Sequence, residues 1–137
     1  MEQSLPADLA GATYISLESL RRNGRPVRTP VWFASVDGTL YVYTDDSSWK
    51  AKRMRNNPAV RVAACSMNGT VRGDWHPARA RFVHEDAAPR EWDTAFRALI
   101  GKQGVLFRLF VLLGRLGIVP RLRRLERHRV IVALELM

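Results

Sequence analysis

The stretch V-W-F-A-S-V-D-G-T-L-Y-V-Y-T, residues 31–44, decides the fold class. Two runs rich in β-branched and aromatic residues, Val31–Val36 and Leu40–Thr44, lie on either side of Asp37-Gly38. Asp-Gly between two such runs is a strong signal for a tight hairpin turn. The stretch therefore predicts two antiparallel strands joined by a short turn.

Segments on both sides extend this hairpin. A strand over Thr13–Leu20 precedes a second turn signal, Asn23-Gly24, which makes the first part of the chain a predicted meander. Further strands are predicted over Val60–Ser66, Val71–His84 and Val130–Leu136, and helices over Trp49–Asn56, Pro89–Leu99 and Val105–Leu116. The fold class is therefore mainly β (α+β), a six-stranded antiparallel β-barrel with packed helices. We expect one domain over residues 1–137, with helices 89–117 packed on the barrel and a closing strand over 128–136.

The charge of the chain is its unusual compositional feature. Its 137 residues include 22 basic and 13 acidic side chains, a formal net charge of +9. Hydrophobic residues make up 47% and charged residues 26%, which fits a globular domain and argues against disorder. The excess positive charge predicts an anionic partner: nucleic acid, an acidic membrane face, or a phosphorylated or polycarboxylate ligand. Composition does not choose among the three.

Several kinds of site are excluded by what the sequence lacks. Cys65 is the only cysteine, so no intrachain disulfide or Cys/His zinc pattern can form, and we interpret it as an inert core thiol. His76, His84 and His128 have no carboxylate partner at helical or strand spacing and are interpreted as surface or edge-strand residues. Redox chemistry would therefore have to come from a bound cofactor. The N-terminus does not resemble a signal peptide and no apolar run approaches the ~20 residues of a membrane span, so we expect a cytoplasmic protein.

The helix predicted over Val105–Leu116 is apolar on most of its circumference. Arg108 and Arg115, seven residues apart, mark a narrow polar stripe on it. Such a helix is usually buried in a core or a subunit interface, and burial is the prediction favoured here. The competing interpretation is a helix lying on a membrane surface, because the following segment, Arg121–Arg129, is basic.

An anion-binding turn is predicted within T-D-D-S-S-W-K-A-K-R-M-R-N-N-P, residues 44–58. A strand ends in a hydroxyl residue, Ser47 and Ser48 form a polar turn, and a helix then begins with Lys50 and places Arg53 one turn later. Hydroxyls, free backbone N–H groups, a helix dipole and two cations around one point are what a phosphate monoester needs. The alternative is a solvated basic helix on a basic protein.

Four blocks of the sequence, taken in order, resemble a known family. They are G-R-P-x-R-T-P-V-W-F (Gly24–Phe33), D-G-T-L-Y-V-Y-T (Asp37–Thr44), S-x-K-x-x-R-x-x-x-N-P (Ser48–Pro58) and G-x-W (Gly73–Trp75). Together they resemble the split β-barrel flavin and deazaflavin oxidoreductases, the pyridoxamine-5′-phosphate-oxidase-like proteins, and in particular their F-420-dependent branch. The resemblance runs from about Thr13 to Val83 and implies an FMN-binding type of split barrel.

The resemblance implies roles for particular residues. A strand of the family lies along the flavin or deazaflavin ring, mostly through backbone groups, and here it matches Arg28, Thr29, Pro30, Val31 and Trp32. The phosphate ligands match Thr44, Ser48 and Lys50, with Arg53 as a second cation and Ser47 beside them in the turn. The family is homodimeric with the cofactor between protomers, so Trp75 is expected to contribute from the other chain. Trp49 departs from the family pattern, in which many relatives have a small residue.

The charge also favours one cofactor over the other. FMN ends at one phosphate, whereas F-420 carries a phospholactyl group and a polyglutamate tail and needs a longer cationic path. The residues expected to supply that path are Lys50, Lys52, Arg53 and Arg55, with Arg79 or Arg81. The sequence therefore favours F-420 over FMN.

The predicted function is that of an F-420-dependent oxidoreductase passing a hydride from C5 of the deazaflavin to a small conjugated substrate. A proton would come from solvent or from a tyrosine such as Tyr41 or Tyr43, and no catalytic residue is assigned. The alternatives are an FMN-binding flavoprotein on the same fold and a non-catalytic basic protein that binds an anion, a cofactor or nucleic acid. No groove-reading helix or aromatic-basic repeat is present, so nucleic acid is not the expected partner.

Overall fold

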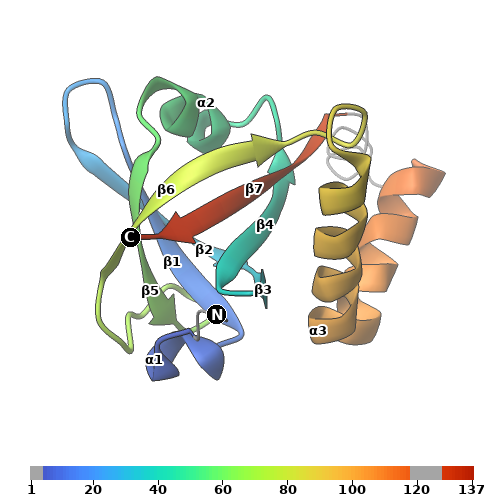
Figure 1. The fold of residues 1–137 in the computed structure, drawn as a ribbon, viewed down its shortest axis with the longest axis horizontal. Coiled ribbons are helices and arrows are strands. Elements are labelled where there is room, and N and C mark those ends of the chain that lie inside the picture. The colour runs from blue at the N-terminus through green and yellow to red at the C-terminus, as the bar shows by residue number, and fades with distance from the viewer. Residues whose placement is uncertain (1–4, 118–127) are drawn as a thin grey trace.

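The computed structural model describes residues 5–117 and 128–137, and its fold is one antiparallel β-sheet with helices packed against it (Figure 1). The strands are β1 (Tyr14–Leu20), β2 (Pro26–Trp32), β3 (Ala34–Val36), β4 (Thr39–Asp45), β5 (Ala59–Cys65), β6 (His76–Val83) and β7 (Arg129–Leu136). The helices are α1 (Ala7–Ala10), α2 (Trp49–Asn56) and α3 (Pro89–Leu116). The segment Arg121–Arg129 lies outside the described residues except for its last two positions.

The sheet contains seven strands among the described residues, so the prediction of six was wrong. Its order is β2-β1-β5-β6-β7-β4-β3, with every pair antiparallel. The segment predicted as one strand over Val31–Val36 is divided between β2 and β3, because the chain leaves the ladder at the buried residue Phe33. The end strands β2 and β3 do not pair with each other, so the strand ladder does not close into a complete barrel.

Turn chemistry explains the two hairpins. Asp37 and Gly38 both have positive φ angles, 50° and 83°, as a tight turn between twisted strands requires. At the β1–β2 turn, the backbone N–H of Arg21 donates to the carbonyl of Arg25 at 2.9 Å, and Gly24 has a φ of 84°. Both turns are at the positions that the sequence predicted. The β1–β2 turn fixes the backbone that carries Arg21 and Arg22.

The larger core lies between the curved faces of the sheet. Ile15 and Leu17 of β1 pack there with Val62 of β5 and Leu134 of β7, all with at most 1% of their surface exposed. Leu9 of α1 is fully buried in the same cluster, so this short helix is held by its one apolar side chain. Burial of such side chains is the main force that holds the sheet in its curved form.

A second core lies between the sheet and α3. Trp92, Ala95 and Leu99, spaced three and four residues apart, face Ile131 and Ala133 of β7. The helical path is broken at Gly104, whose φ of 66° and ψ of −140° are not helical. The two helices predicted over Pro89–Leu99 and Val105–Leu116 are therefore two helical halves joined at this glycine.

The long strand predicted over Val71–His84 is shorter in the structure. Only His76–Val83 forms β6, and Val71 makes an isolated bridge to Cys65. The intervening loop is tied to α1 instead: the Asp8 carboxylate accepts a hydrogen bond from the Asp74 backbone N–H at 3.0 Å. Gly73 lies in this loop, between Val71 and the start of β6.

Candidate functional site

The turn between β4 and α2 has the local structure that its sequence predicts. Ser48 is the N-cap of α2, and its hydroxyl accepts a hydrogen bond from the Ala51 backbone N–H at 3.2 Å. Asp45 Oδ1 accepts from the Ser47 hydroxyl at 2.6 Å and from its backbone N–H at 2.7 Å. Thr44, at the end of β4, is buried. Ser47 and Ser48 thus lie just before α2 with the Asp45 carboxylate bonded to Ser47, whereas Thr44 is buried within β4.

Two predicted phosphate ligands of α2, Lys50 and Arg53, lie close to each other. Burial lowers the pKa of Lys50, and the Arg53 guanidinium lowers it further, while Asp45 acts in the opposite direction. Burial also lowers the pKa of Arg53, and its positively charged neighbour there is Arg21. Arginine stays protonated in proteins, so these cations repel one another unless an anion lies between them.

The Arg53 side chain is held in position from β1. Its Nε donates to the hydroxyl of the buried residue Ser19 at 2.8 Å. Because a guanidinium has five N–H donors in a planar fork, this bond leaves donors available for another acceptor. Ser19 thus orients Arg53 without neutralising it.

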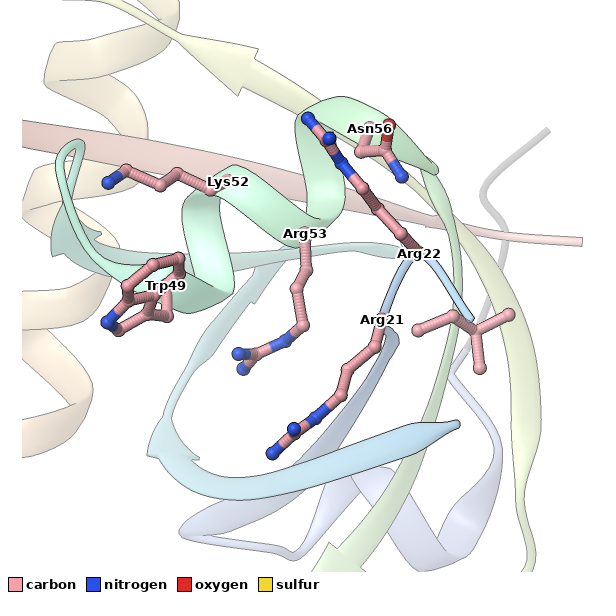
Figure 2. Close-up of a pocket in the computed structure, with 7 residues that line it drawn as sticks. Arg21, Arg22, Trp49, Lys52, Arg53 and Asn56 are labelled. Carbon is pink, nitrogen blue, oxygen red and sulfur yellow. The ribbon is translucent and has the colours of Figure 1, made fainter. Parts of the chain in front are cut away.

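A pocket of about 750 Å³ opens beside Arg53, between α2 and the β1–β2 turn (Figure 2). We call it the cationic pocket, and its lining is Leu20, Arg21, Arg22, Trp49, Lys52, Arg53 and Asn56. Within the described residues, that lining has four cations and no carboxylate. In Figure 2 the guanidinium groups of Arg21 and Arg53 point to the same side of the pocket. Such a lining creates a positive potential that favours a ligand with more than one negative charge.

Trp49 forms an exposed wall of the cationic pocket. It is the first residue of α2, and 75% of its surface is accessible. The Lys52 ammonium lies 4.6 Å from the centre of its ring. An indole with a cation on its face offers stacking and charge at one position. The residue that departs from the family pattern is therefore at the mouth of the pocket.

Two cations expected on the path for an anionic tail are held by carboxylates instead. Arg55 forms an ion pair with Asp46 and also donates to its backbone carbonyl at 3.0 Å. Arg81 donates to both Glu91 oxygens, at 2.7 and 2.8 Å, and to Glu135, which raises its pKa.

Arg21 and Arg22, and not Arg55 and Arg81, are the further arginines that line the cationic pocket. Sequence reasoning missed both, although a basic pair directly before the Asn23-Gly24 turn was a readable signal. A turn of this kind brings its flanking residues to the end of the sheet, and here that end faces α2.

The strand expected to lie along the flavin ring divides its side chains between two faces. Thr29 and Val31 are opposite Leu17 and Ile15 in the register with β1, so they face the larger core. Arg28, Pro30 and Trp32 alternate with them and face the other side; the Trp32 ring lies 6.4 Å from that of Tyr14. Since β2 is an edge strand, its backbone is the part of this segment available for a ring contact.

Arg28 and Trp75 belong to a separate group that we call the Glu18 cluster, made up of Glu18, Arg28, Arg61 and Trp75. Glu18 is 5% exposed and accepts from Arg28 Nε at 2.9 Å and from Arg61 Nε at 2.7 Å. The two guanidinium carbons lie 4.7 and 5.0 Å from the centre of the Trp75 ring. The bonds from Arg61 and Arg28 lower the pKa of the Glu18 carboxyl. Trp75 is therefore held within its own chain beside β2.

The tyrosines considered as proton donors lie in the second core. Tyr41 is buried and donates to Glu91 at 2.8 Å; burial first, and then the Glu91 carboxylate, raise its pKa to about 12. Tyr43 packs against the rings of Trp92 and Phe96. Neither tyrosine lines the cationic pocket.

His76 has a carboxylate partner far away in the sequence, and not at the helical or strand spacing that the sequence analysis considered. Its Nε2 lies 3.0 Å from Asp8 Oδ2, and this contact is the main cause of the lowered pKa of Asp8. The partners are 68 positions apart, so no local spacing could have indicated the pair. In the described part of the chain, no group of three or more His, Cys, Asp or Glu side chains is arranged to hold a metal ion. No helix there is long and apolar enough to cross a membrane.

Solved structures with this fold include proteins of different kinds. The heme storage protein HutZ from Vibrio cholerae is 14% identical with a TM-score of 0.65, covering 93% of this chain and 84% of that one. The conserved hypothetical protein Rv2991 from Mycobacterium tuberculosis is 19% identical with a TM-score of 0.63, covering 96% and 84%. An F420 reductase is 15% identical with a TM-score of 0.58, covering 100% and 96%. At these identities the likeness is one of fold.

Sequence comparison identifies the family. No curated protein matches the chain. The family model described as pyridoxamine 5′-phosphate oxidase matches residues 1–129, which includes every strand except most of β7 and both the cationic pocket and the Glu18 cluster. The chain therefore belongs to the pyridoxamine 5′-phosphate oxidase family.

Proposed function

We propose that the protein is an F-420-dependent oxidoreductase that transfers a hydride to a small conjugated substrate. The observation that carries the proposal is the cationic pocket, in which Arg21, Arg22, Lys52 and Arg53 surround about 750 Å³. An F420 reductase shares the fold, and the family includes oxidoreductases. The choice of F-420 over FMN rests on the number of positive charges in the pocket.

The donors of the pocket fit a phosphorylated, carboxylate-tailed cofactor. Arg53 disfavours the charge of Lys50, which is not among the lining residues of the pocket, and Arg21 disfavours the charge of Arg53. A phosphate between them would turn repulsion into charge-assisted hydrogen bonds, each contributing about 1.5–3 kcal/mol. Arg22 and Lys52 would then face the acidic tail. FMN has only its phosphate to offer these further cations, which is why F-420 is preferred.

The ring of the cofactor would lie along the free edge of β2. Backbone groups between Arg28 and Trp32 are exposed to this edge because β1 is the one strand, among those that the structure describes, that pairs with β2. The Glu18 cluster holds Trp75 next to the same strand through its contact with Arg28. We further propose that a second protomer of a homodimer covers this edge and completes the ring site.

The bound deazaflavin would supply the hydride, and the chain's own residues would bind and orient it. Arg21, Lys50 and Arg53 would hold the phosphate end, and the capped start of α2 would keep Lys50 and Arg53 on one side of the helix. Orientation and exclusion of water are the contributions a protein of this kind makes to hydride transfer. The substrate proton would come from solvent, since Tyr41 is hydrogen-bonded to Glu91 and has a pKa of about 12.

An FMN-binding flavoprotein is the second candidate, and the β4–α2 turn favours it. Ser47, Ser48 and Lys50 lie at one helix start, which suits a single phosphate monoester without a tail. On this alternative Arg22 and Lys52 would have no role in binding.

Titration of the purified protein with F-420, FMN and hemin, followed by fluorescence or absorbance, tests the proposal. We expect saturable binding of F-420 that is tighter than binding of FMN. The variant Arg22→Gln should weaken F-420 and leave FMN unchanged, because only the acidic tail reaches that side of the pocket. Arg97→Gln, on the outer side of α3, is the matched control. Binding of hemin alone, or equal loss of both cofactors in Arg22→Gln, would contradict the F-420 assignment.

A further inference from the structure

A second pocket, of about 530 Å³, lies at the opposite end of β1 from the cationic pocket. We call it the Arg72 pocket, and the lining residues that define it are Tyr14, Cys65, Ser66, Met67 and Arg72. Small-molecule sites have volumes of roughly 300–1,000 Å³, so the pocket is of a suitable size for one. Tyr14 is the first residue of β1 and Leu20, in the cationic pocket, is the last, so about 20 Å of strand separates the two pockets. In Figure 1, α1 and α2 mark these two ends.

The Arg72 pocket adjoins the end of the strand that is proposed to carry the cofactor ring. Tyr14 is the register partner of Trp32 in β2 and of Cys65 in β5, so the three side chains form one row on the same face of the sheet. The rings of Tyr14 and Trp32 are 6.4 Å apart. A ligand in this pocket would therefore lie beside the ring end of the cofactor and away from its phosphate end, as a hydride acceptor must.

Arg72 supplies a cation to this pocket. Its backbone N–H donates to the Ala64 carbonyl at 2.8 Å, which ties the residue to β5. Among the residues that the structure describes, no carboxylate forms an ion pair with its guanidinium. Burial raises the pKa of the Cys65 thiol, and the nearby Arg72 guanidinium lowers it. The positive charge thus acts at the buried wall of the pocket.

The carboxylate that also lines the pocket, Asp8, is already bonded to other groups. Its Oδ2 accepts from the Asp74 backbone N–H at 3.0 Å and lies 3.0 Å from His76 Nε2, and its Oδ1 lies 3.2 Å from the same nitrogen. The hydrogen bond with His76 is the main cause of the lowered pKa of Asp8. Both carboxylate oxygens are therefore occupied, whereas the Arg72 guanidinium has donors left for a ligand.

We propose that the Arg72 pocket is the substrate site and that it binds a small conjugated acid whose carboxylate pairs with Arg72. The proposal rests on the reductase function proposed above and names the substrate class of that enzyme. A guanidinium binds a carboxylate through two parallel hydrogen bonds, which fixes the orientation of the ligand as well as its position. The Tyr14 ring and the Met67 side chain, which is 73% exposed, would contact the apolar part of the acid.

Titration of the whole protein with trans-cinnamate, followed by calorimetry, tests the proposal without any cofactor. We expect saturable binding of cinnamate and about tenfold weaker binding of trans-cinnamamide, which has a similar shape and no charge. Arg72→Gln should lose the same factor for cinnamate and nothing for cinnamamide. The matched control is Arg79→Gln, at an exposed arginine of β6 outside the pocket, and it should bind cinnamate as the wild type does.

Gly11→Leu tests the cavity without changing its charge. Gly11 lines the pocket with a φ of −95°, and an added Cβ would have no described atom within 4 Å apart from its chain neighbours. The leucine should therefore remove cinnamate binding while urea denaturation shows the stability of the wild type. Leu112 of α3 is 50% exposed, contrary to the burial predicted for its helix, and offers apolar surface elsewhere. Leu112→Ser should leave cinnamate binding unchanged.

The outcomes separate this proposal from the assignment of the cofactor. Arg72→Gln should bind F-420 as the wild type does, and Arg21→Gln/Arg22→Gln should lose F-420 but keep cinnamate. A wild type that binds F-420 and not cinnamate would overturn the substrate site alone. Binding of cinnamate without F-420 would overturn the reductase and the substrate role with it. Equal affinity for cinnamate and cinnamamide, or unchanged cinnamate binding in Arg72→Gln, would overturn the role of Arg72.

Discussion

Two neighbouring residues of β1, Glu18 and Ser19, bind arginine side chains in different ways. Glu18 accepts hydrogen bonds from both Arg28 and Arg61, so its carboxylate balances one of the two positive charges of the Glu18 cluster within the fold. Ser19, the next residue, points to the other face of the strand. Its hydroxyl accepts a hydrogen bond from Arg53, which orients the guanidinium but does not neutralise its charge. The cationic pocket around Arg53 has no carboxylate in its described lining.

The difference separates structural cations from those available to a ligand. A buried carboxylate paired with two guanidinium groups stabilises the fold, and its negative charge weakens the attraction of these arginines for a further anion. Cations that share a pocket without a carboxylate repel one another in the free protein, and that repulsion is relieved when an anion binds. The comparison predicts opposite results for substitution of Glu18, in the Glu18 cluster, and of Arg21, in the cationic pocket.

The largest effect is expected for Glu18→Gln. Removing the charge leaves two guanidinium groups without their carboxylate, and we expect a loss of about 2 kcal/mol in the free energy of unfolding. This is below the roughly 3–5 kcal/mol of a fully buried pair because Arg28 and Arg61 are about half exposed. Urea denaturation followed by circular dichroism measures the loss. A value within a few tenths of wild type would show that the Glu18 cluster does not stabilise the fold.

The difference in stability between the wild type and Glu18→Gln should depend on pH. The pKa of Glu18 is lowered in the folded state, so its contribution is complete above its unfolded value near 4.5 and is lost as pH falls through the folded pKa. The difference in stability between wild type and Glu18→Gln should therefore be constant from neutral pH to about 5 and shrink below 4.5. Urea denaturation at a series of pH values checks this. A difference that grew in acid would have the wrong sign.

Arg21→Gln should have the opposite balance of effects. It removes a cation that repels Arg53, so the free energy of unfolding should stay the same or rise slightly. Affinity for a phosphorylated cofactor should fall roughly tenfold, the worth of one charge-assisted hydrogen bond. Equilibrium titration and urea denaturation of the same preparation measure both quantities. A clear loss of stability would show that Arg21 stabilises the fold as Arg28 does, and would contradict the distinction between the cationic pocket and the Glu18 cluster.

A smaller loss is expected for Gly73→Ala, in the loop beside the Glu18 cluster. An added Cβ would lie 2.7 Å from Asp8 Oδ2 and 3.1 Å from Asp8 Cβ, so the carboxylate that binds Asp74 and His76 must shift. We expect about 1 kcal/mol of destabilisation, typical of a forced local rearrangement. In the Asp8→Ala background the same substitution should cost much less, which a double-mutant cycle would measure. Equal costs in both backgrounds would refute the close contact.

The smallest effect is expected for the exposed pair of Asp93 and Arg97. Their side chains are 58% and 79% exposed and lie one turn apart on α3. Asp93→Asn should change the free energy of unfolding by only about 0.3–0.5 kcal/mol. It is the baseline against which the buried carboxylate Glu18 is compared. A loss as large as that of Glu18→Gln would mean that burial does not explain the difference.

Local signals in the sequence predicted much of the fold. The helix over Trp49–Asn56 and its cap by Ser48 follow from neighbours in the chain, as does the turn at Asp37-Gly38. The break between two helical halves follows from Gly104. Each of these depends on contacts within a few residues, which periodicity and turn chemistry can register.

The remaining features depend on contacts across the sheet. The cations of the pocket come from α2 and from the β1–β2 turn, about 30 positions earlier, and which arginines are neutralised depends on the register that places Glu18 opposite Arg28 and Arg61. The pairing of Asp8 with His76 spans the length of the meander. Spacing along the chain does not encode such pairs, so the role of Glu18 was missed. The basic pair Arg21-Arg22 was a local signal that was overlooked, and phosphate binding by Lys50 and Arg53 stays a prediction.

The most direct test of the account is a titration of wild type and the double variant Arg21→Gln/Arg53→Gln with F-420, followed by fluorescence. We expect saturable binding by the wild type, a loss of more than about tenfold in the double variant, and no loss in the control Arg97→Gln on the exposed side of α3. Binding that is absent in the wild type, or equally strong in the double variant, would contradict the claim that the cationic pocket holds the cofactor.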